Sequence, residues 1–381
     1  MKLMYKLSLF ALLLTSVNLF AQEASVATES TDPLTTEPEK EEVKEEEETS
    51  FSFSGYVDAY YQANLSTSEA ASEDPLVFPT SFTDFANTFG IGNVNLLAEK
   101  TMGKVSFVGQ VGFGPRATQA NGGNGANFAS TVQQLYVAYS PSESVTFTLG
   151  NFGTFVGYEV IDANANVNYS TSYLFSNGPF FHTGAKVDVA LAEGFGAMVG
   201  VFNDTDAKID GTAGKHLGAQ LSAETGGLAA YLNVLAGKED EGITDDSDDD
   251  LNEFQVDLTA TYEVSESFML GLNASSYSTS RDGNGEGGFF GTALYATIGA
   301  GDNVDVGLRA EYFNLTAPEG VTIDEPNVLS ITASGNITID DDLRIIPEIR
   351  FDTGSNGFLF GDDPADESVA AFILAAVYSF N

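Results

Sequence analysis

The chain has 381 residues, no cysteine, no tryptophan, and 55 acidic against 15 basic side chains, for a formal net charge of −40 at pH 7. The lack of cysteine excludes disulfides, thiolate metal sites and a cysteine nucleophile. The excess of acid argues against nucleic-acid binding, because phosphate contacts need clustered Lys and Arg. His182 and His216 are the only imidazoles, so we expect neither a metal site nor a cofactor.

Residues 1–21 have the pattern of a secretory signal peptide. Lys2 and Lys6 precede an apolar stretch that runs to Phe20, and Ala21 stands before the expected cleavage point. A membrane-anchoring helix is the alternative, but the apolar stretch is short and no basic residues follow it.

Residues 22–50 carry 11 acidic side chains against Lys40 and Lys44 and show no apolar periodicity. Such a segment cannot bury enough apolar surface to offset the entropy of ordering. We therefore expect an acidic, disordered periplasmic linker over 22–50, followed by one folded domain over 51–381. Contact with a cationic partner is the functional alternative for the linker.

From residue 51 onward the dominant pattern has a period of two. On residues 304–312 one face is apolar, whereas Asp305, Arg309 and Glu311 lie on the other. The same alternation recurs at 105–113, 217–224, 254–263, 329–339 and 372–380. Runs of about 9 to 13 residues suit a tilted strand that crosses a bilayer, and no apolar stretch is long enough for a transmembrane helix.

The spacing of turn residues gives the number of strands. Short turns are expected at 101–103, 141–144, 193–194, 225–226, 265–266, 299–302 and 340–342. Longer polar stretches alternate with them at 64–88, 115–129, 152–180, 205–214, 238–250, 279–287, 315–326 and 354–366. This alternation predicts an all-β fold, a transmembrane antiparallel barrel of about 16 strands. A large soluble β-sandwich or a propeller is the alternative, since alternation alone does not exclude a water-facing sheet.

Several short motifs are similar to one family. They are FSGYVDAYY at 53–61, Gly157-Tyr158-Glu159, Asn168-Tyr169-Ser170 with Tyr173, and Pro179-Phe180 with His182-Thr183-Gly184. With them, the chain from about Phe53 to Phe380 resembles the OmpL-like beta-barrel porins of Gram-negative outer membranes. The LFAQ sequence at the signal junction resembles secreted proteins of the Bacteroidetes. The resemblance implies a porin fold and solute diffusion.

The third loop, 152–180, is the longest and is rich in aromatic and amide side chains. In 16-stranded porins this loop folds inward and narrows the pore, so we expect the same here. It leaves between the fifth and sixth strands, which places strands 13 and 14 on the opposite wall. The candidate constriction residues are Tyr158, Glu159, Asp162, Arg309, Glu311 and Arg350. Acids of the loop facing Arg309 would produce a transverse field, weakened by Glu311. Alternatively, the loop lies flat against the wall and Arg309 pairs only with Glu311.

Inward-facing charges set the expected selectivity. The bases expected inside by parity are Lys186, Arg309, Arg344 and Arg350, and the acids are Asp58, Asp188, Glu224, Asp257, Glu263, Asp305, Glu311, Glu348 and Asp352. The surplus of acid predicts a porin for ions and small hydrophilic solutes that weakly favours cations. An anion or phosphate porin is one alternative, and a non-conducting structural or adhesin barrel with acidic outer loops is another.

An enzyme is not expected. No G-x-S-x-G motif is present, and we assign His182 a structural hydrogen bond to the third loop. The acidic run 245–250 lacks the glycine and terminal glutamate of a calcium loop. We expect location in the outer membrane, with extracellular loops and both termini periplasmic. The expected partners are membrane lipid and lipopolysaccharide, small hydrophilic solutes, the barrel-assembly machinery and two further copies in a homotrimer.

Overall fold

The computed structural model describes residues 49–66, 78–122, 128–211, 214–239, 251–281, 284–321, 324–340, 342–356, 358–359 and 368–381. The expected signal peptide, nearly all of the expected acidic linker and the acidic run 245–250 lie outside these residues. Among the described helices, none is long and apolar enough to cross a membrane.

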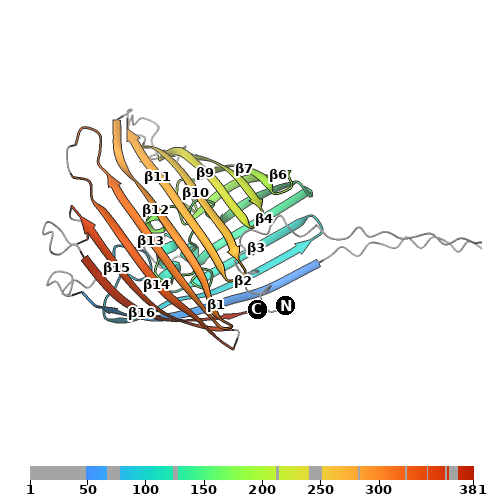
Figure 1. Ribbon diagram of the computed structural model, residues 1–381. Coiled ribbons are helices and arrows are strands. Elements are labelled where there is room, and N and C mark those ends of the chain that lie inside the picture. The colour runs from blue at the N-terminus through green and yellow to red at the C-terminus, as the bar shows by residue number, and fades with distance from the viewer. Residues whose placement is uncertain are drawn as a thin grey trace, which may run out of the picture.

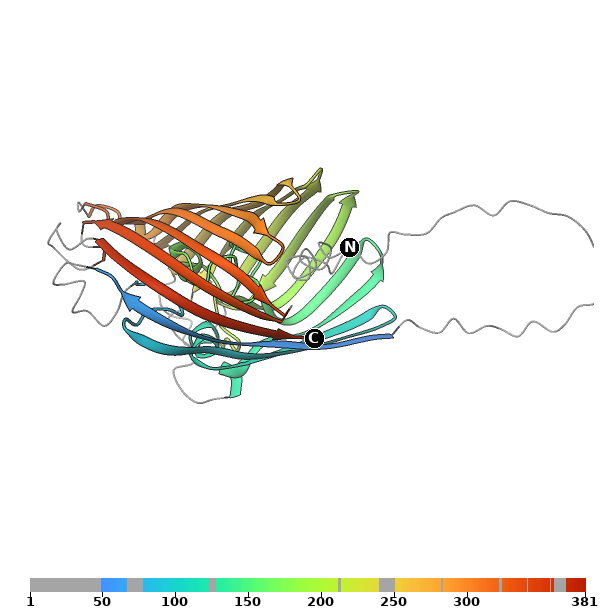
Figure 2. The same ribbon diagram turned by 60° about the horizontal axis from the view of Figure 1, so that its bottom comes forward.

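The described residues form sixteen antiparallel strands that close into one barrel (Figures 1 and 2). The strands are β1 (Thr49–Asn64), β2 (Thr88–Met102), β3 (Val105–Phe113), β4 (Val132–Ser142), β5 (Val145–Gly153), β6 (Phe181–Ala192), β7 (Phe195–Phe202), β8 (His216–Thr225), β9 (Leu228–Glu239), β10 (Leu251–Ser265), β11 (Phe268–Arg281), β12 (Asn284–Gly301), β13 (Val304–Thr316), β14 (Asn327–Ile339), β15 (Leu343–Ser355) and β16 (Ser368–Phe380). Each strand pairs with its sequence neighbours, and β1 closes the ring against β16 from Gly55↔Phe380 to Asn64↔Ala371.

Short helical segments lie between some strands. They are α3 (Pro115–Ala120), the 3₁₀ helix η1 (Phe128–Thr131) and α4 (Tyr173–Asn177). Pro115 begins α3, where its missing N–H would have no helical partner anyway. Ser172 caps α4, because its side chain accepts a hydrogen bond from the backbone N–H of Phe175 at 3.0 Å.

The predicted fold class and the seven short turns are confirmed, and two expectations need correction. The strands range from 8 residues in β7 to 18 in β12, beyond the expected 9 to 13. The long loop expected at 279–287 is wrong, since β11 and β12 pair as far as Arg281↔Asn284. The register of the pair shifts between Thr279 and Ser280. Gly287 and Gly288 have positive φ angles of 111° and 157°. These two irregularities let β11 and β12 continue through the described part of this glycine-rich stretch.

The strands alternate between an apolar outer face and a polar inner face. On β13, Leu308 and Tyr312 are 39% and 41% exposed, whereas Arg309 and Glu311 are each 1% exposed. A sheet in water shows the reverse arrangement, with charges outside and apolar side chains buried. This inside-out pattern is what a lipid-facing barrel wall requires.

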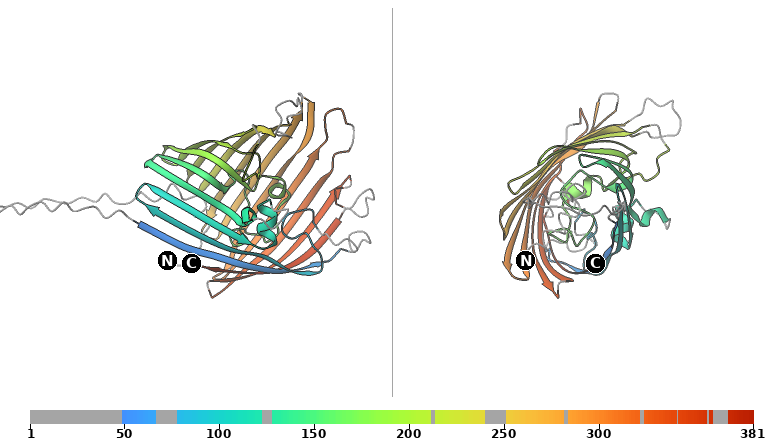
Figure 3. Two further views of the ribbon diagram at one scale, coloured as in Figure 1. Left: turned by 180° about the vertical axis from the view of Figure 1, so that it is seen from behind. Right: turned by 90° about the vertical axis from the view of Figure 1, so that its right-hand side faces the viewer.

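The barrel is not an empty tube, because chain segments lie within the ring of strands (Figure 3). Every strand has an inward side chain that is at most 6% exposed. These side chains are Asp58, Asn95, Gln110, Gln133, Thr148, His182, Met198, His216, Asn233, Asp257, Asn273, Ala293, Arg309, Thr332, Glu348 and Ile373. Each strand therefore has at least one position on its inner face that is closed to water.

Candidate functional site

The segment 154–180, which we call the inner segment, connects β5 to β6 and contacts widely separated parts of the wall. The backbone N–H of Gly157 donates to Asp257 on β10 at 3.0 Å, and the hydroxyl of Tyr169 donates to Asp58 on β1 at 2.7 Å. β1 and β10 are on different sides of the closed ring. One segment can reach both only from inside the barrel.

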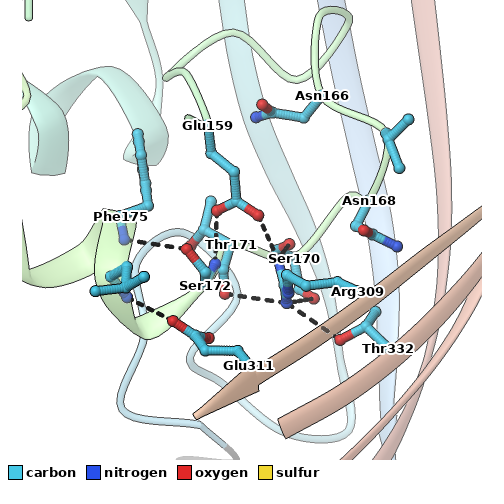
Figure 4. A network of polar contacts seen from close by, with 12 residues as sticks. Glu159, Asn166, Asn168, Ser170, Thr171, Ser172, Phe175, Arg309, Glu311 and Thr332 are labelled. Carbon is cyan, nitrogen blue, oxygen red and sulfur yellow. Dashed lines mark hydrogen bonds and ion pairs between the residues drawn. The ribbon is translucent and has the colours of Figure 1, made fainter. Parts of the chain in front are cut away.

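Arg309 attaches the inner segment to β13 (Figure 4). Its Nη1 lies 2.6 Å from Oε1 of Glu159 and 2.7 Å from the carbonyl oxygen of Ser170. Its Nη2 donates to the carbonyl of Thr171 at 3.3 Å and to the hydroxyl of Thr332 on β14 at 3.1 Å. One buried guanidinium therefore joins two strands to two parts of the inner segment, a use that suits its planar array of donors.

Two inward carboxylates accept backbone N–H groups of the inner segment. Glu311 accepts those of Tyr173 and Leu174 at 2.9 and 2.7 Å, and Glu348 on β15 accepts those of residues 169 and 170 at 2.7 and 3.1 Å. An irregular segment cannot satisfy its own buried amides, and a carboxylate makes strong hydrogen bonds to them. These acids replace the regular hydrogen bonds that the inner segment lacks.

Arg350 on β15 attaches the inner segment to the wall through a second buried arginine. Its guanidinium pairs with Asp352 at 2.8 Å and donates to the carbonyl of Thr171 at 2.9 Å. It also stacks over the ring of Phe78 at 4.2 Å, while Asp352 accepts the hydroxyl of Tyr173 at 2.6 Å. Both side chains of this ion pair are fully buried, so neither charge faces water.

Asp162 contacts another part of the wall, beyond β16 in the ring. Its carboxylate accepts hydrogen bonds from Gln133 at 2.8 Å, Gln110 at 2.9 Å, Tyr56 at 3.2 Å and Asn95 at 3.3 Å. These donors come from β1 to β4. Burial raises the pKa of Asp162, and the hydrogen bonds from Gln133, Gln110 and Tyr56 and the charge of Arg116 partly offset that effect.

Arg116 of α3 extends this second attachment. Its Nη2 is 3.6 Å from Asp58, and its Nη1 donates to the carbonyl of Ile161 at 3.2 Å. The same guanidinium stacks on the rings of Phe82 and Tyr169, at 4.5 and 5.2 Å. α3 and the segment around Phe82 therefore pack with the inner segment as one layer.

Glycines on the wall make room for side chains of the inner segment. Tyr158 stacks on Tyr295 at 4.2 Å, and its hydroxyl lies 2.4 Å from where a Cβ on Gly271 would stand. A Cβ on Gly307 would lie 2.6 Å from Val167. The wall therefore contains recesses that match this segment, and a larger residue at either position would displace it.

The structure divides the predicted constriction residues into two groups. Glu159, Arg309, Glu311 and Arg350 meet around residues 170–173, Tyr158 stacks beside them, and Asp162 binds to β1–β4.

The expected transverse field across open water is wrong, because Glu159 and Arg309 are in direct contact and buried. The alternative pairing of Arg309 with Glu311 is also wrong, since Glu311 accepts backbone amides.

Sequence reasoning missed Arg116, which lies in a predicted loop and has no periodicity to mark it as buried. It also missed Phe78 and Phe82, which are 0% and 6% exposed although they lie in a stretch expected to be an outer loop. The predicted structural role of His182 is confirmed, because its Nε2 lies 3.0 Å from the hydroxyl of Thr154.

Water-facing charges are found instead toward the short turns. The inward acids there are Glu99, Asp188, Glu224, Glu263 and Asp305, each partly or fully exposed. Lys186 pairs with Asp188 at 2.9 Å while both stay about a quarter exposed, at 23% and 26%. Among the described residues, no group of three or more His, Cys, Asp or Glu is placed to hold a metal ion.

A closed sixteen-strand barrel with an apolar exterior and an inner segment defines a porin-type outer-membrane barrel. The family model described as "Putative beta-barrel porin-2, OmpL-like" matches residues 50–380, and the chain belongs to this family. A search of curated protein sequences found no match.

Solved structures of porins share the fold at low sequence identity. An anion-selective porin from Comamonas acidovorans is 15% identical with a TM-score of 0.60, over 87% of this chain and 100% of that one. The outer membrane channel DcaP of Acinetobacter baumannii is 14% identical with a TM-score of 0.58, over 87% and 97%. The trimer form of in-vitro folded OmpT of Vibrio cholerae is 14% identical with a TM-score of 0.56, over 87% and 99%.

Proposed function

We propose that this protein is an outer-membrane porin through which ions and small hydrophilic solutes diffuse passively, and that its inner segment sets the conductance. The observation that carries the proposal is the attachment of residues 154–180 to both sides of a porin-type barrel by buried charges. A barrel of this strand number without such a segment would enclose a wide aqueous channel. The family and the fold are those of a channel rather than an enzyme.

We propose that the passage weakly favours cations. Arg116, Arg309 and Arg350 are at most 1% exposed and each contacts a carboxylate, so they contribute little field to the water. The charges that remain in contact with water are mainly the acids near the short turns. Fixed carboxylates in a low-dielectric pore raise the local cation concentration.

The test is planar-bilayer conductance of the refolded protein, with the reversal potential measured in a KCl gradient. A cation-sign potential that shrinks at high salt is expected, because salt screens the acids. An anion-sign potential would refute the selectivity and favour an anion or phosphate porin. The anion-selective neighbour from Comamonas acidovorans supports the fold only, at 15% identity.

A non-conducting barrel is the second candidate, and one observation favours it. Every strand has an inward side chain that is at most 6% exposed, so at least one position on the inner face of each strand is closed to water. Refolded protein that inserts into bilayers and gives no channels under any voltage would establish this candidate.

We further propose an arrangement in the cell. A signal peptide over 1–21 and an acidic linker over 22–50 would place the short turns in the periplasm and the long loops outside. The trimer form of the structurally similar OmpT of Vibrio cholerae supports a homotrimer. Lipopolysaccharide would contact the outer face, and the assembly machinery would insert the barrel. Crosslinking in intact membranes tests the oligomer, and protease access from outside tests the orientation.

A further inference from the structure

The described wall has a gap beside β2, near the end with the long loops. β2 pairs with β1 as far as Thr88, but its pairing with β3 begins only at Val94↔Phe113. The chain leaves β3 at Gly114, whose φ is +140° and where a Cβ would lie 2.5 Å from the carbonyl oxygen of Gly92. α3 follows at once. Residues 88–91 therefore have a described strand partner along one edge only.

A cavity of about 890 Å³ lies at this gap. Its lining includes Tyr60 of β1, Phe82, Asp84, residues 88–91 of β2, and Thr118 and Gln119 of α3. Successive residues of a strand point to opposite faces, yet four consecutive residues of β2 line this one cavity. Phe89 and Ile91 are 86% and 68% exposed on the outer face, whereas the inward ring of Tyr60 lies against Gly90. The cavity therefore continues around the free edge of β2, from the lipid side of the wall to its inner side.

The inner end of the cavity is aromatic and strained. Phe82 has a φ of +77°, a conformation that non-glycine residues rarely adopt. The side chain of Gln119 accepts its N–H at 2.8 Å, and the hydroxyl of Tyr60 donates to its carbonyl at 3.2 Å. Strained residues persist only where their surroundings hold them, and they cluster at binding sites. Among the lining residues, Asp84 is the only charged one.

We propose that a membrane lipid occupies this cavity, with an acyl chain passing around the edge of β2 toward Phe82. Phe89 and Ile91 continue the apolar outer face of Val94, which is 43% exposed, so lipid already contacts the entrance. The volume is within the usual range for ligand pockets, and apolar side chains with a few polar groups line it. The described lining residues include no Lys or Arg, so the cavity does not suit a free anion and favours a neutral or zwitterionic lipid.

The edge of β2 that has no strand partner among the described residues favours a lipid over a plain hydrocarbon as the occupant. Unpaired peptide groups are costly in the apolar part of a bilayer, and they need polar partners. The ester and hydroxyl groups of a lipid would supply such partners at the edge while the acyl chain fills the cavity. The proposal requires only that the barrel lies in a membrane, and it is independent of whether the barrel conducts.

The absence of tryptophan from the chain makes the test direct. The variant Tyr60→Trp places a single tryptophan at the inner side of the cavity. The folded variant is placed in phosphatidylcholine vesicles with brominated or ordinary acyl chains. Phe107→Trp, on the lipid face, is the positive control, and Tyr231→Trp, inside the barrel near the short turns, is the negative control.

We expect brominated chains to quench Tyr60→Trp at least half as strongly as Phe107→Trp. If Tyr60→Trp does not fold, Thr118→Trp in α3 probes the same cavity from its other wall. Quenching no stronger than that of Tyr231→Trp would overturn the proposal. So would a dimer in which the free edge of β2 pairs with a second copy, because that pairing would exclude lipid and leave the cavity tryptophan unquenched.

Discussion

The variant Arg309→Ala removes the cation that joins the inner segment to β13. The carboxylate of Glu159, 5% exposed, would lose its partner at 2.6 Å, and the carbonyl group of Ser170 would lose its donor. The carbonyl of Thr171 would lose one of two donors and keep Arg350. Removing one member of a buried ion pair costs about 3–5 kcal/mol, mostly because the other charge stays buried and unpaired. Detachment of the inner segment would return Glu159 to water and relieve that cost.

The expected effect follows from this energy. Since 1.4 kcal/mol is a tenfold change in an equilibrium, the population with a detached segment should rise by about two to four orders of magnitude. Single-channel recording in planar bilayers should show more frequent openings, larger than those of the parent. The double variant Glu159→Leu with Arg309→Met removes both charges and keeps the volume, so it should close nearly as often as the parent.

The result that would refute this reasoning is specific. If folded Arg309→Ala, identified by heat-modifiable mobility on gels, gives the same openings as the parent, the ion pair does not hold the segment. If the double variant opens as often as the single one, the effect comes from lost packing rather than from an unpaired charge.

Three further predictions concern selectivity, pH and packing. Asp188→Asn should reduce cation preference, because it removes a water-facing acid. The measurement is a smaller reversal potential in a KCl gradient. An unchanged potential would place the selective charges elsewhere. Asp206 accepts two backbone N–H groups at the end of the inner segment, and burial raises its pKa to about 6 from 3.8. Between pH 3.8 and about pH 6 the folded state therefore binds a proton that the unfolded state has lost. The free energy of unfolding should fall by up to about 3 kcal/mol as the pH rises through this range. Asp206→Asn should remove this pH dependence, measured by urea unfolding at pH 4 and pH 7. Gly307→Val should loosen the inner segment at Val167 and lower the free energy of unfolding by about 1–3 kcal/mol. Gly109→Val is the control and should cost much less, because no atom lies within 4 Å of the Cβ position of Gly109. Equal costs would contradict the fit between Gly307 and Val167.

The sequence predicts the wall well because period-two alternation is a local property. On β13 the alternation assigns Arg309 and Glu311 to the inner face, and both are inside. The glycine-rich stretch 279–287 shows the limit of this reasoning. Its composition is that of a loop, but paired strands on both sides extend it as a bulged hairpin.

The partners of the inner charges could not be predicted in the same way. Parity places Arg309 inside, but it does not reveal whether the side chain meets water, Glu311 or the third loop. The pairing with Glu159 depends on the path of an irregular segment across 150 residues of sequence separation. Arg116 gives no local signal, because its burial depends on Asp58 and Tyr169 arriving from two other parts of the chain.

Tyr169 bridges the place where the barrel closes. Its hydroxyl binds Asp58 on β1 and its backbone N–H binds Glu348 on β15, so it spans the seam formed by β1 and β16. A contact between the two ends of a long chain forms only after the intervening strands have assembled, because early closure would carry a large entropic cost. Docking of the inner segment is therefore expected late in folding. Once docked, the inner segment holds β1 and β15 together across the β1–β16 seam, the one pairing among the described strands that is not between sequence neighbours.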